Sequence, residues 1–96
     1  MNTEPVTPTA KPSNPKDALI AKVAAPFRTY FEGAAESVSA VNNTGPFDIL
    51  SGHHNFLSLL SACEIIIRSS QGEQRIQISR GVMHVRDNKV TVFLDV

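Results

Sequence analysis

The sequence predicts an all-β domain, an antiparallel two-sheet β-sandwich or flattened barrel of about 8 to 10 short strands. Apolar residues recur with a period of two, and clusters of Gly, Pro, Asn, Asp and Ser separate the apolar runs at short intervals. Helical spacing is poor throughout, while β-branched residues dominate the second half of the chain. Together these observations favour strands joined by tight turns.

The clearest alternation lies at the end of the chain, where one face of the predicted strand carries Val90, Val92, Leu94 and Val96. The same alternation predicts strands around Val38, Ala40, Cys63, Ile65, Ile67, Ile76 and Ile78. The small apolar run from Leu19 to Ala25 predicts a first strand that ends at Pro26. Asp87 and Asn88 predict a two-residue hairpin turn, because both tolerate positive φ better than most residues.

Residues 1–16 differ in composition from the rest of the chain. Four prolines stand among Thr, Ser, Asn and Lys, and nothing in the segment would repay the entropy of ordering it. We therefore predict a disordered Pro-rich tail over residues 1–16 and one β-sandwich domain over residues 17–96.

The composition excludes several classes of function. Nine Lys and Arg balance nine Asp and Glu among 96 residues, so the formal net charge is zero. That balance gives no electrostatic reason to expect nucleic acid or an anionic membrane as a partner. The longest apolar runs are far too short to span a bilayer. We expect a small intracellular domain that binds no nucleic acid and does not insert directly into a membrane.

Residues 45–60 break the alternating pattern, because Gly, Pro and paired His stand among large apolar residues. We expect this irregular segment to fold back into the core with its apolar side chains, which are Phe47, Ile49, Leu50, Phe56, Leu57 and Leu60. Any surplus apolar surface there would form a patch for a partner.

No motif for bond chemistry stands out, and we predict a protein that is not an enzyme and holds no cofactor. Ser, His and Asp occur without a nucleophile elbow, and there is no Gly-rich phosphate loop. His53, His54, His84 and Cys63 could in principle bind zinc, but no pair has a recognised ligand spacing. Adjacent histidines on extended backbone also point to opposite sides. We expect no metal site, and an inert buried thiol at Cys63.

Three segments resemble, in order and spacing, a family pattern. The first is Phe31 to Ser39, which resembles the family's F-x-G-x-x-x-S-V. The second is Gly45 to His53, which resembles G-x-x-G-I-L-P-G-H. The third is Gly81 to Val92, which resembles G-G-x-x-E-V-x-x-N-x-V-T-V-L, with Arg80 in place of the first Gly of that pattern. The family is the epsilon subunit of F-type, rotary ATP synthases, and the resemblance is to its N-terminal β-sandwich domain. Departures such as Ser51 for Pro and His84 for Glu concern local shape.

The resemblance implies a non-catalytic central-stalk subunit of the F1 sector, which serves ATP synthesis and proton or other ion transport. In that family the sandwich packs against the gamma subunit and the c-ring and passes rotation to the catalytic head. By position, the residues expected to face the c-ring are Gly45, Pro46, Phe47 and Asp48. His53 and Ser58 would lie near gamma. Phe47 is either an exposed anchor or, more commonly for an aromatic residue at a bend, part of the core.

Family members continue with a helical hairpin that inhibits ATP hydrolysis and in some members binds ATP. The resemblance therefore implies a short form that lacks these helices, peripheral at the cytoplasmic face of a bacterial inner membrane. The alternative is a free-standing epsilon-like adaptor or binding module in the cytoplasm, outside the ATPase. The Pro-rich tail and the missing hairpin favour that alternative slightly, and a metal-dependent function ranks last.

Overall fold

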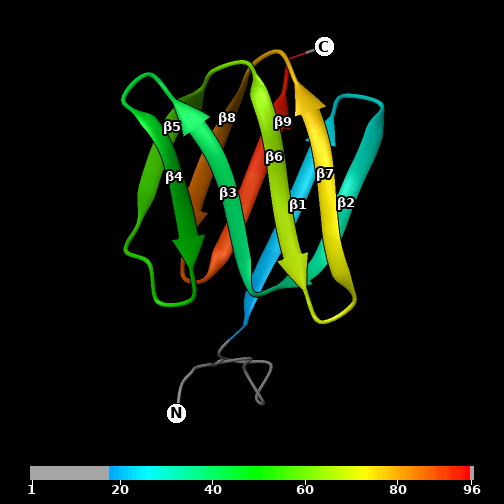
Figure 1. Cartoon of the computed structure of the whole chain (residues 1–96), viewed down its shortest axis with the longest axis vertical. Helices are drawn as coiled ribbons and strands as arrows, with labels where there is room; N and C mark the ends of the chain where they lie inside the picture. Colours follow the sequence, from blue (N-terminus) through cyan, green and yellow to red (C-terminus); the bar gives the residue numbers. More distant parts are fainter. Residues whose placement is uncertain (1–17, 96) are drawn as a thin grey trace.

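The computed structural model describes residues 18–95, so the predicted tail and Val96 lie outside the described part. Residues 18–95 form nine strands and no helix (Figure 1). The strands are β1 (Leu19–Ala25), β2 (Arg28–Ala35), β3 (Ser37–Asn42), β4 (Gly45–Leu50), β5 (Phe56–Leu60), β6 (Cys63–Ser69), β7 (Gly72–Ile78), β8 (Gly81–Arg86) and β9 (Lys89–Leu94). The predicted all-β class is confirmed.

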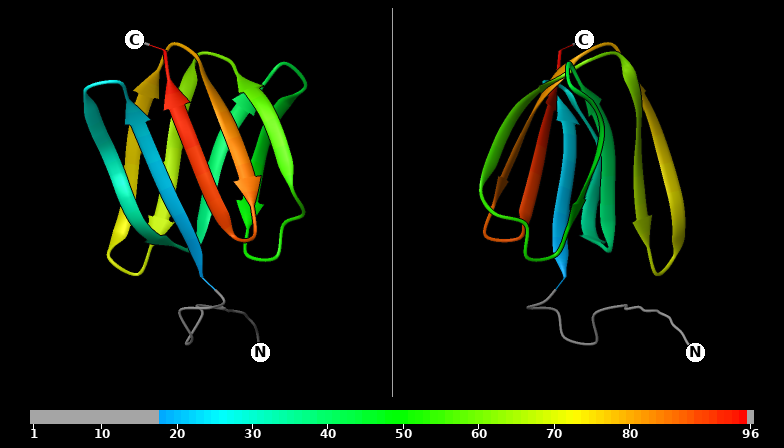
Figure 2. Two further views of the ribbon diagram at one scale, coloured as in Figure 1. Left: turned by 180° about the vertical axis from the view of Figure 1, so that it is seen from behind. Right: turned by 60° about the vertical axis from the view of Figure 1, so that its left-hand side comes forward.

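The strands make two sheets that face each other. One sheet has five strands in the order β2-β1-β9-β8-β5, and the other has four in the order β4-β3-β6-β7 (Figure 2). Four hairpins join neighbours within one sheet: β1 and β2, β3 and β4, β6 and β7, and β8 and β9. The chain crosses to the other sheet after β2, β4, β5 and β7. The two-sheet sandwich predicted from the sequence is therefore confirmed.

One strand pair departs from the expected antiparallel arrangement. β1 runs parallel to β9, with Ala21 opposite Val90 and Val23 opposite Val92. The six other strand pairs in residues 18–95 are antiparallel. Alternation along a strand shows which side chains turn inward but not the direction of a distant neighbour, so the sequence pattern could not reveal this parallel pair.

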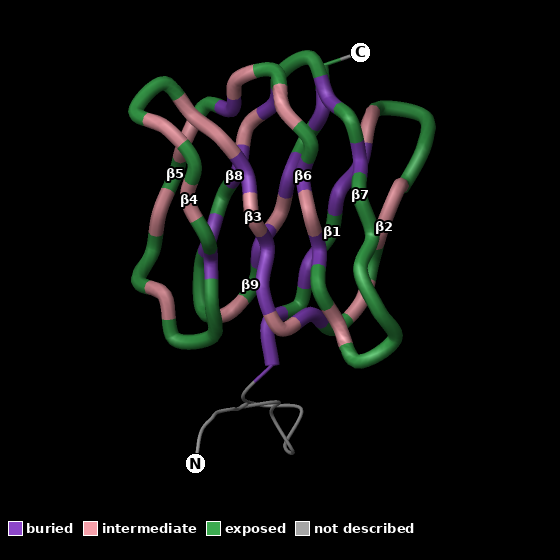
Figure 3. The backbone as a smooth tube through the Cα atoms, viewed as in Figure 1, coloured by how far each residue is buried: buried purple, intermediate pink, exposed green. Residues whose placement is uncertain are grey.

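The core lies between the sheets and follows the period-two pattern. The largest fully buried side chains come from both sheets and are Leu19, Val23, Val38, Ile49, Ile65, Ile67, Met83, Val85, Val90 and Val92. Figure 3 shows buried positions alternating with exposed ones along the strands of both sheets. Two facing sheets that share such a core make a stiff unit, since each strand is held by its ladder and by packing.

Two predicted turns appear at the expected positions. β1 ends at Ala25 directly before Pro26, and residues 26–27 make the turn into β2. Asp87 and Asn88 have φ of 50° and 62° and join β8 to β9. Both residues therefore take the left-handed backbone that a two-residue hairpin of this kind requires, and the predicted hairpin is confirmed.

Residues 45–60 form β4, a loop over residues 51–55, and β5. The side chains that pack inward as expected are Phe47, Ile49, Phe56 and Leu60. The expectation is wrong for Leu50 and Leu57, which are exposed. Each belongs to a regular strand whose alternate side chains must turn outward, so the segment cannot bury all of its apolar residues.

Candidate functional site

Four apolar side chains form a continuous row on the outer face of the five-stranded sheet. Leu59 of β5 lies opposite Val82 of β8, Val82 lies opposite Phe93 of β9, and Phe93 lies opposite Ala24 of β1. Leu59 is 75% exposed and Phe93 is 58% exposed. We call Leu59, Val82, Phe93 and Ala24 the apolar row.

Exposed large apolar side chains are concentrated in the apolar row and near it. Six large apolar residues stand out as exposed in residues 18–95, and five belong to the five-stranded sheet or its β1–β2 turn: Ile20, Phe27, Leu57, Leu59 and Phe93. Hollows of about 550 and 620 Å³ lie on the two sides of Phe93. Such a concentration of exposed apolar side chains on one face is typical of a surface that binds a protein partner.

The outer face of the four-stranded sheet is chemically different. A chain of polar contacts crosses all four strands and links, in order, Asp48, Ser39, Arg68, Glu73, Arg75 and Glu64. Arg75 lies 2.9 Å from Glu64 and 2.6 Å from Glu73, and its hydrogen bond with Glu64 is the main cause that raises its pKa. Because these charges satisfy one another, this face has the character of a hydrated surface.

The residues expected at the c-ring lie on β4, an edge strand of the four-stranded sheet. Pro46 and Asp48 are exposed, whereas Phe47 is half-buried and packs against the core. The ring centroid of Phe47 lies 5.5 Å from that of Phe56 on β5, so the two rings meet where the sheets adjoin. Of the two alternatives for Phe47, the structure shows the core position.

His53 belongs to the loop over residues 51–55 and is half-buried. Its ring meets Phe56 edge-on, with 5.5 Å between centroids, and its Nδ1 lies 2.8 Å from the carbonyl oxygen of His54. The rings of His53 and His54 stack, with centroids 4.6 Å apart and planes inclined by 20°. The expectation that the two histidines point to opposite sides is therefore wrong, because the segment is a loop and not an extended strand.

Ser58, the second residue expected near gamma, lies in the middle of β5 and is half-buried. Its hydroxyl accepts a hydrogen bond of 3.1 Å from Nδ2 of Asn42 on β3. This bond ties the five-stranded sheet to the four-stranded sheet. His53 and Ser58 thus stand at different levels of the sandwich, one in an end loop and the other within a strand.

The four residues considered for zinc do not form a site. Cys63, expected to be buried, is only half-buried at the start of β6, where it packs against the core, and His84 is exposed on β8. Among residues 18–95, no group of three or more His, Cys, Asp or Glu could hold a metal ion. The same described part contains no helix long and apolar enough to cross a membrane.

The apolar row does not follow from the sequence pattern alone. A partial signal was present, because Leu57 and Leu59 alternate with the inward side chains of β5, and Phe93 alternates with Val92 and Leu94. These residues become one surface only when the register of β1, β5, β8 and β9 is known. Pattern along a single strand does not contain that register.

The chain is thus a two-layer β-sandwich with an exposed apolar row on the outer face of one sheet and a network of paired charges on the outer face of the other. Residues 19–96 match the β-sandwich domain of the ATP synthase delta/epsilon chain, and the chain belongs to this family.

Two curated relatives bear the name ATP synthase epsilon chain. The one from Endomicrobium trichonymphae is 35% identical over 71 residues, which cover 74% of this chain and 51% of the relative. The one from Francisella tularensis subsp. holarctica (strain LVS) is 31% identical over 80 residues, which cover 83% of this chain and 55% of the relative. The chain therefore spans about half the length of the curated relatives it matches.

Solved structures share the fold. A chain in the structure of the Euglena gracilis mitochondrial ATP synthase (OSCP/F1/c-ring) aligns with a TM-score of 0.76 and 18% identity, covering 90% of this chain and 56% of that chain. A chain in the Tetrahymena thermophila mitochondrial ATP synthase (central stalk/c-ring) aligns with a TM-score of 0.71 and 15% identity, covering 81% and 63%. At these identities the likeness establishes the fold.

Proposed function

We propose that this chain is a non-catalytic subunit of the central stalk of a rotary F-type ATP synthase, where it couples rotation of the c-ring, through the gamma subunit, to the catalytic head. Membership of the delta/epsilon family and the two epsilon-chain relatives support this role. Because both relatives come from bacteria, the proposed location is the cytoplasmic face of the inner membrane, as a peripheral protein.

The observation that carries the proposal is the contrast between the two outer faces. A part that transmits torque needs stiffness and surfaces by which other subunits hold it, not reactive groups. Burying one exposed Leu or Phe stabilises a contact by about 1.5–3 kcal/mol, so the apolar row offers substantial binding energy. We assign the contact with gamma to the apolar row and, by family position, to His53 in the loop before β5 and Ser58 on β5.

The proposed contact with the c-ring lies elsewhere, on the edge strand β4. Pro46 and Asp48 are exposed there, and Gly45 precedes them at the start of the strand. Proline has no backbone N–H, so Pro46 protects this edge strand against pairing with another strand. β4 and the apolar row belong to different sheets, which allows gamma and the c-ring to bind at the same time.

The proposal concerns the sandwich only. Inhibition of ATP hydrolysis and binding of ATP are expected of a helical hairpin in the family, and neither role is assigned to residues 18–95. These residues contain strands and turns, which supply the stiff coupling part.

Binding to the gamma subunit of the same organism tests the proposal. We expect the purified chain to form a complex with purified gamma at micromolar concentration, detected by co-elution and calorimetry. The double variant Leu59→Gln/Phe93→Gln should weaken the complex, and Ile66→Gln, on the outer face of the four-stranded sheet, should not. A folded chain that does not bind gamma at these concentrations would contradict the proposal and favour the free-standing adaptor.

A further inference from the structure

Phe27 has no role in holding the fold together. It is 101% exposed, at the tip of the two-residue turn between β1 and β2. Pro26 precedes it and fixes its own φ, which limits the freedom of the turn that carries the ring. A fully exposed aromatic ring on a restrained turn gains nothing from burial in this chain, but it is well suited to insertion into a partner.

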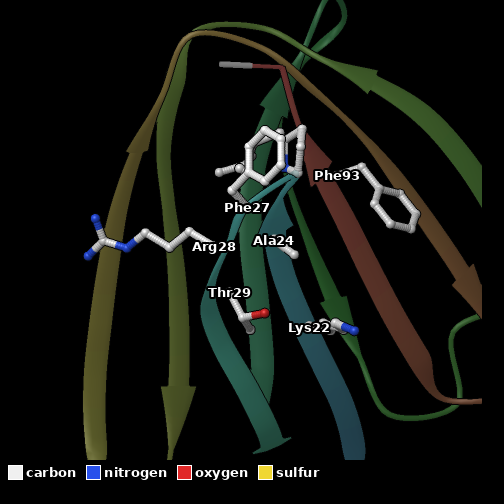
Figure 4. A pocket seen from close by; sticks show the side chains of 9 residues that line it. Lys22, Ala24, Phe27, Arg28, Thr29 and Phe93 are labelled. Carbon is white, nitrogen blue, oxygen red and sulfur yellow. The ribbon is translucent and has the colours of Figure 1, made fainter.

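Beside Phe27 lies an open pocket of about 550 Å³ whose floor includes Ala24. Figure 4 shows the Phe93 side chain on one side of the pocket and the Arg28 side chain on the other, with Lys22 further along β1. Phe93 also belongs to the apolar row. The pocket is therefore one end of a longer apolar surface.

The charged residues that line this pocket are both basic. Lys22 and Arg28 are its only ionisable lining residues, and neither forms an ion pair within residues 18–95. Arg28 places its guanidinium 4.6 Å from the centre of the Tyr30 ring. Glu32 lies opposite Lys22 in the register of β1 and β2 but makes no ion pair with it. The pocket thus combines apolar walls with unpaired positive charge.

We propose that Phe27 and this pocket dock a protein surface that presents an apolar side chain next to carboxylates. Phe27 enters an apolar hollow of the partner, the partner's apolar side chain contacts Ala24 and Phe93, and its carboxylates face Lys22 and Arg28. The inference rests on the proposed function, since it states the chemistry of the central-stalk partner that binds there.

Two observations favour a protein partner of this chemistry over other occupants. The apolar row continues the pocket across four strands, about 14 Å at about 4.8 Å per strand, which suits a protein surface better than one small molecule. A second copy docked about a two-fold axis would bring Lys22 and Arg28 toward their own equivalents, and like charges oppose that contact.

The test measures affinity for purified gamma at about 50 mM and about 500 mM salt. Phe27→Ala should weaken binding by about tenfold or more at both salt concentrations, as expected for an inserted aromatic anchor. Lys22→Gln/Arg28→Gln should weaken binding by about threefold to tenfold at low salt and by much less at high salt. The matched controls are Ile66→Ala, on the outer face of the four-stranded sheet, and Gln71→Glu/Gln74→Glu, which lowers the net charge equally.

Each outcome decides the matter. If wild type binds gamma and Phe27→Ala binds within about twofold of it, the docking site is wrong while the proposed function stands. If the charge variant matches its control at low salt, the acidic chemistry of the partner is wrong. If wild type does not bind gamma, both proposals fail. A self-associated chain that Phe27→Ala converts to monomer, seen by sedimentation, would assign the pocket to a second copy and overturn the inference.

Discussion

The backbone N–H of Gly52 donates a hydrogen bond of 2.8 Å to Oδ1 of Asn88, which fastens the β4–β5 loop to the β8–β9 turn. The carbonyl oxygen of Asn88 also accepts a bond of 2.8 Å from the N–H of Ile20 at the start of β1. One turn residue thus connects three segments that lie far apart in the sequence. The loop that carries His53 is held to the five-stranded sheet through this residue.

Substitution of Asn88 separates its two contributions. Asn88→Gly keeps the positive φ and loses the side-chain hydrogen bond, so we expect a loss of about 1 kcal/mol in the free energy of unfolding. Asn88→Ala loses the same hydrogen bond and also replaces a residue that tolerates left-handed backbone with one that does not, so it should cost about 2 kcal/mol or more. Urea unfolding of both variants measures the difference. An alanine variant as stable as the glycine variant would contradict this account of the turn.

Phe47 and Phe27 form a matched pair for testing which aromatic residues stabilise the fold. Phe47→Ala removes a half-buried ring from its contact with Phe56 and should lower the free energy of unfolding by about 2–3 kcal/mol. Phe27→Ala should change it by less than about 0.5 kcal/mol, because the ring contacts solvent only. Thermal and urea unfolding of both variants measure these changes in the free energy of unfolding. Equal losses would contradict the claim that Phe47 stabilises the fold and Phe27 does not.

Gly81 begins β8 at a point where the backbone of β9 leaves no room for a side chain. A Cβ atom at residue 81 would lie 2.8 Å from the carbonyl oxygen of Phe93. We expect Gly81→Ala to destabilise the protein by about 1–3 kcal/mol, since the backbone of one strand must shift. Ser79→Ala, two residues earlier and exposed, is the control and should be nearly neutral. A stable Gly81→Ala variant would mean that β8 and β9 are less closely packed.

What the sequence predicted correctly depends on neighbours along the chain. β1 with its end at Pro26, and the turn at Asp87 and Asn88, follow from local backbone preferences and a period of two. The parallel pairing of β1 with β9 depends on residues some 70 positions apart, and no local pattern contains it.

The candidate site shows the same division. The stacking of His53 on His54 depends on the path of a loop, which alternation does not describe. Alternation along each strand places Leu59 and Phe93 on an outer face. That Val82 lies between them, opposite both, follows only from the register of the strand pairs. Family resemblance supplied the proposed interface at Pro46 and Asp48, which the geometry of a single sandwich does not single out.

The two proposed contact surfaces should be separable by mutation. Pro46→Trp adds bulk at the exposed edge strand β4 and should weaken retention on purified c-ring by about tenfold, as expected for a disrupted interface, while leaving affinity for gamma unchanged. Leu59→Gln should do the reverse. Binding assays with each partner separately give the comparison. If either variant weakens both contacts equally while remaining folded, gamma and the c-ring share one surface and the assignment of two surfaces is wrong.

The most direct test of the coupling role is ATP-driven ion pumping by membrane vesicles whose ATP synthase has been stripped of this subunit. If the sandwich couples the rotor to the head, adding back the purified chain should restore ion uptake per ATP hydrolysed, and the chain carrying Leu59→Gln/Phe93→Gln should restore much less. Uptake per ATP that stays the same with and without the wild-type chain, while hydrolysis continues, would contradict the account.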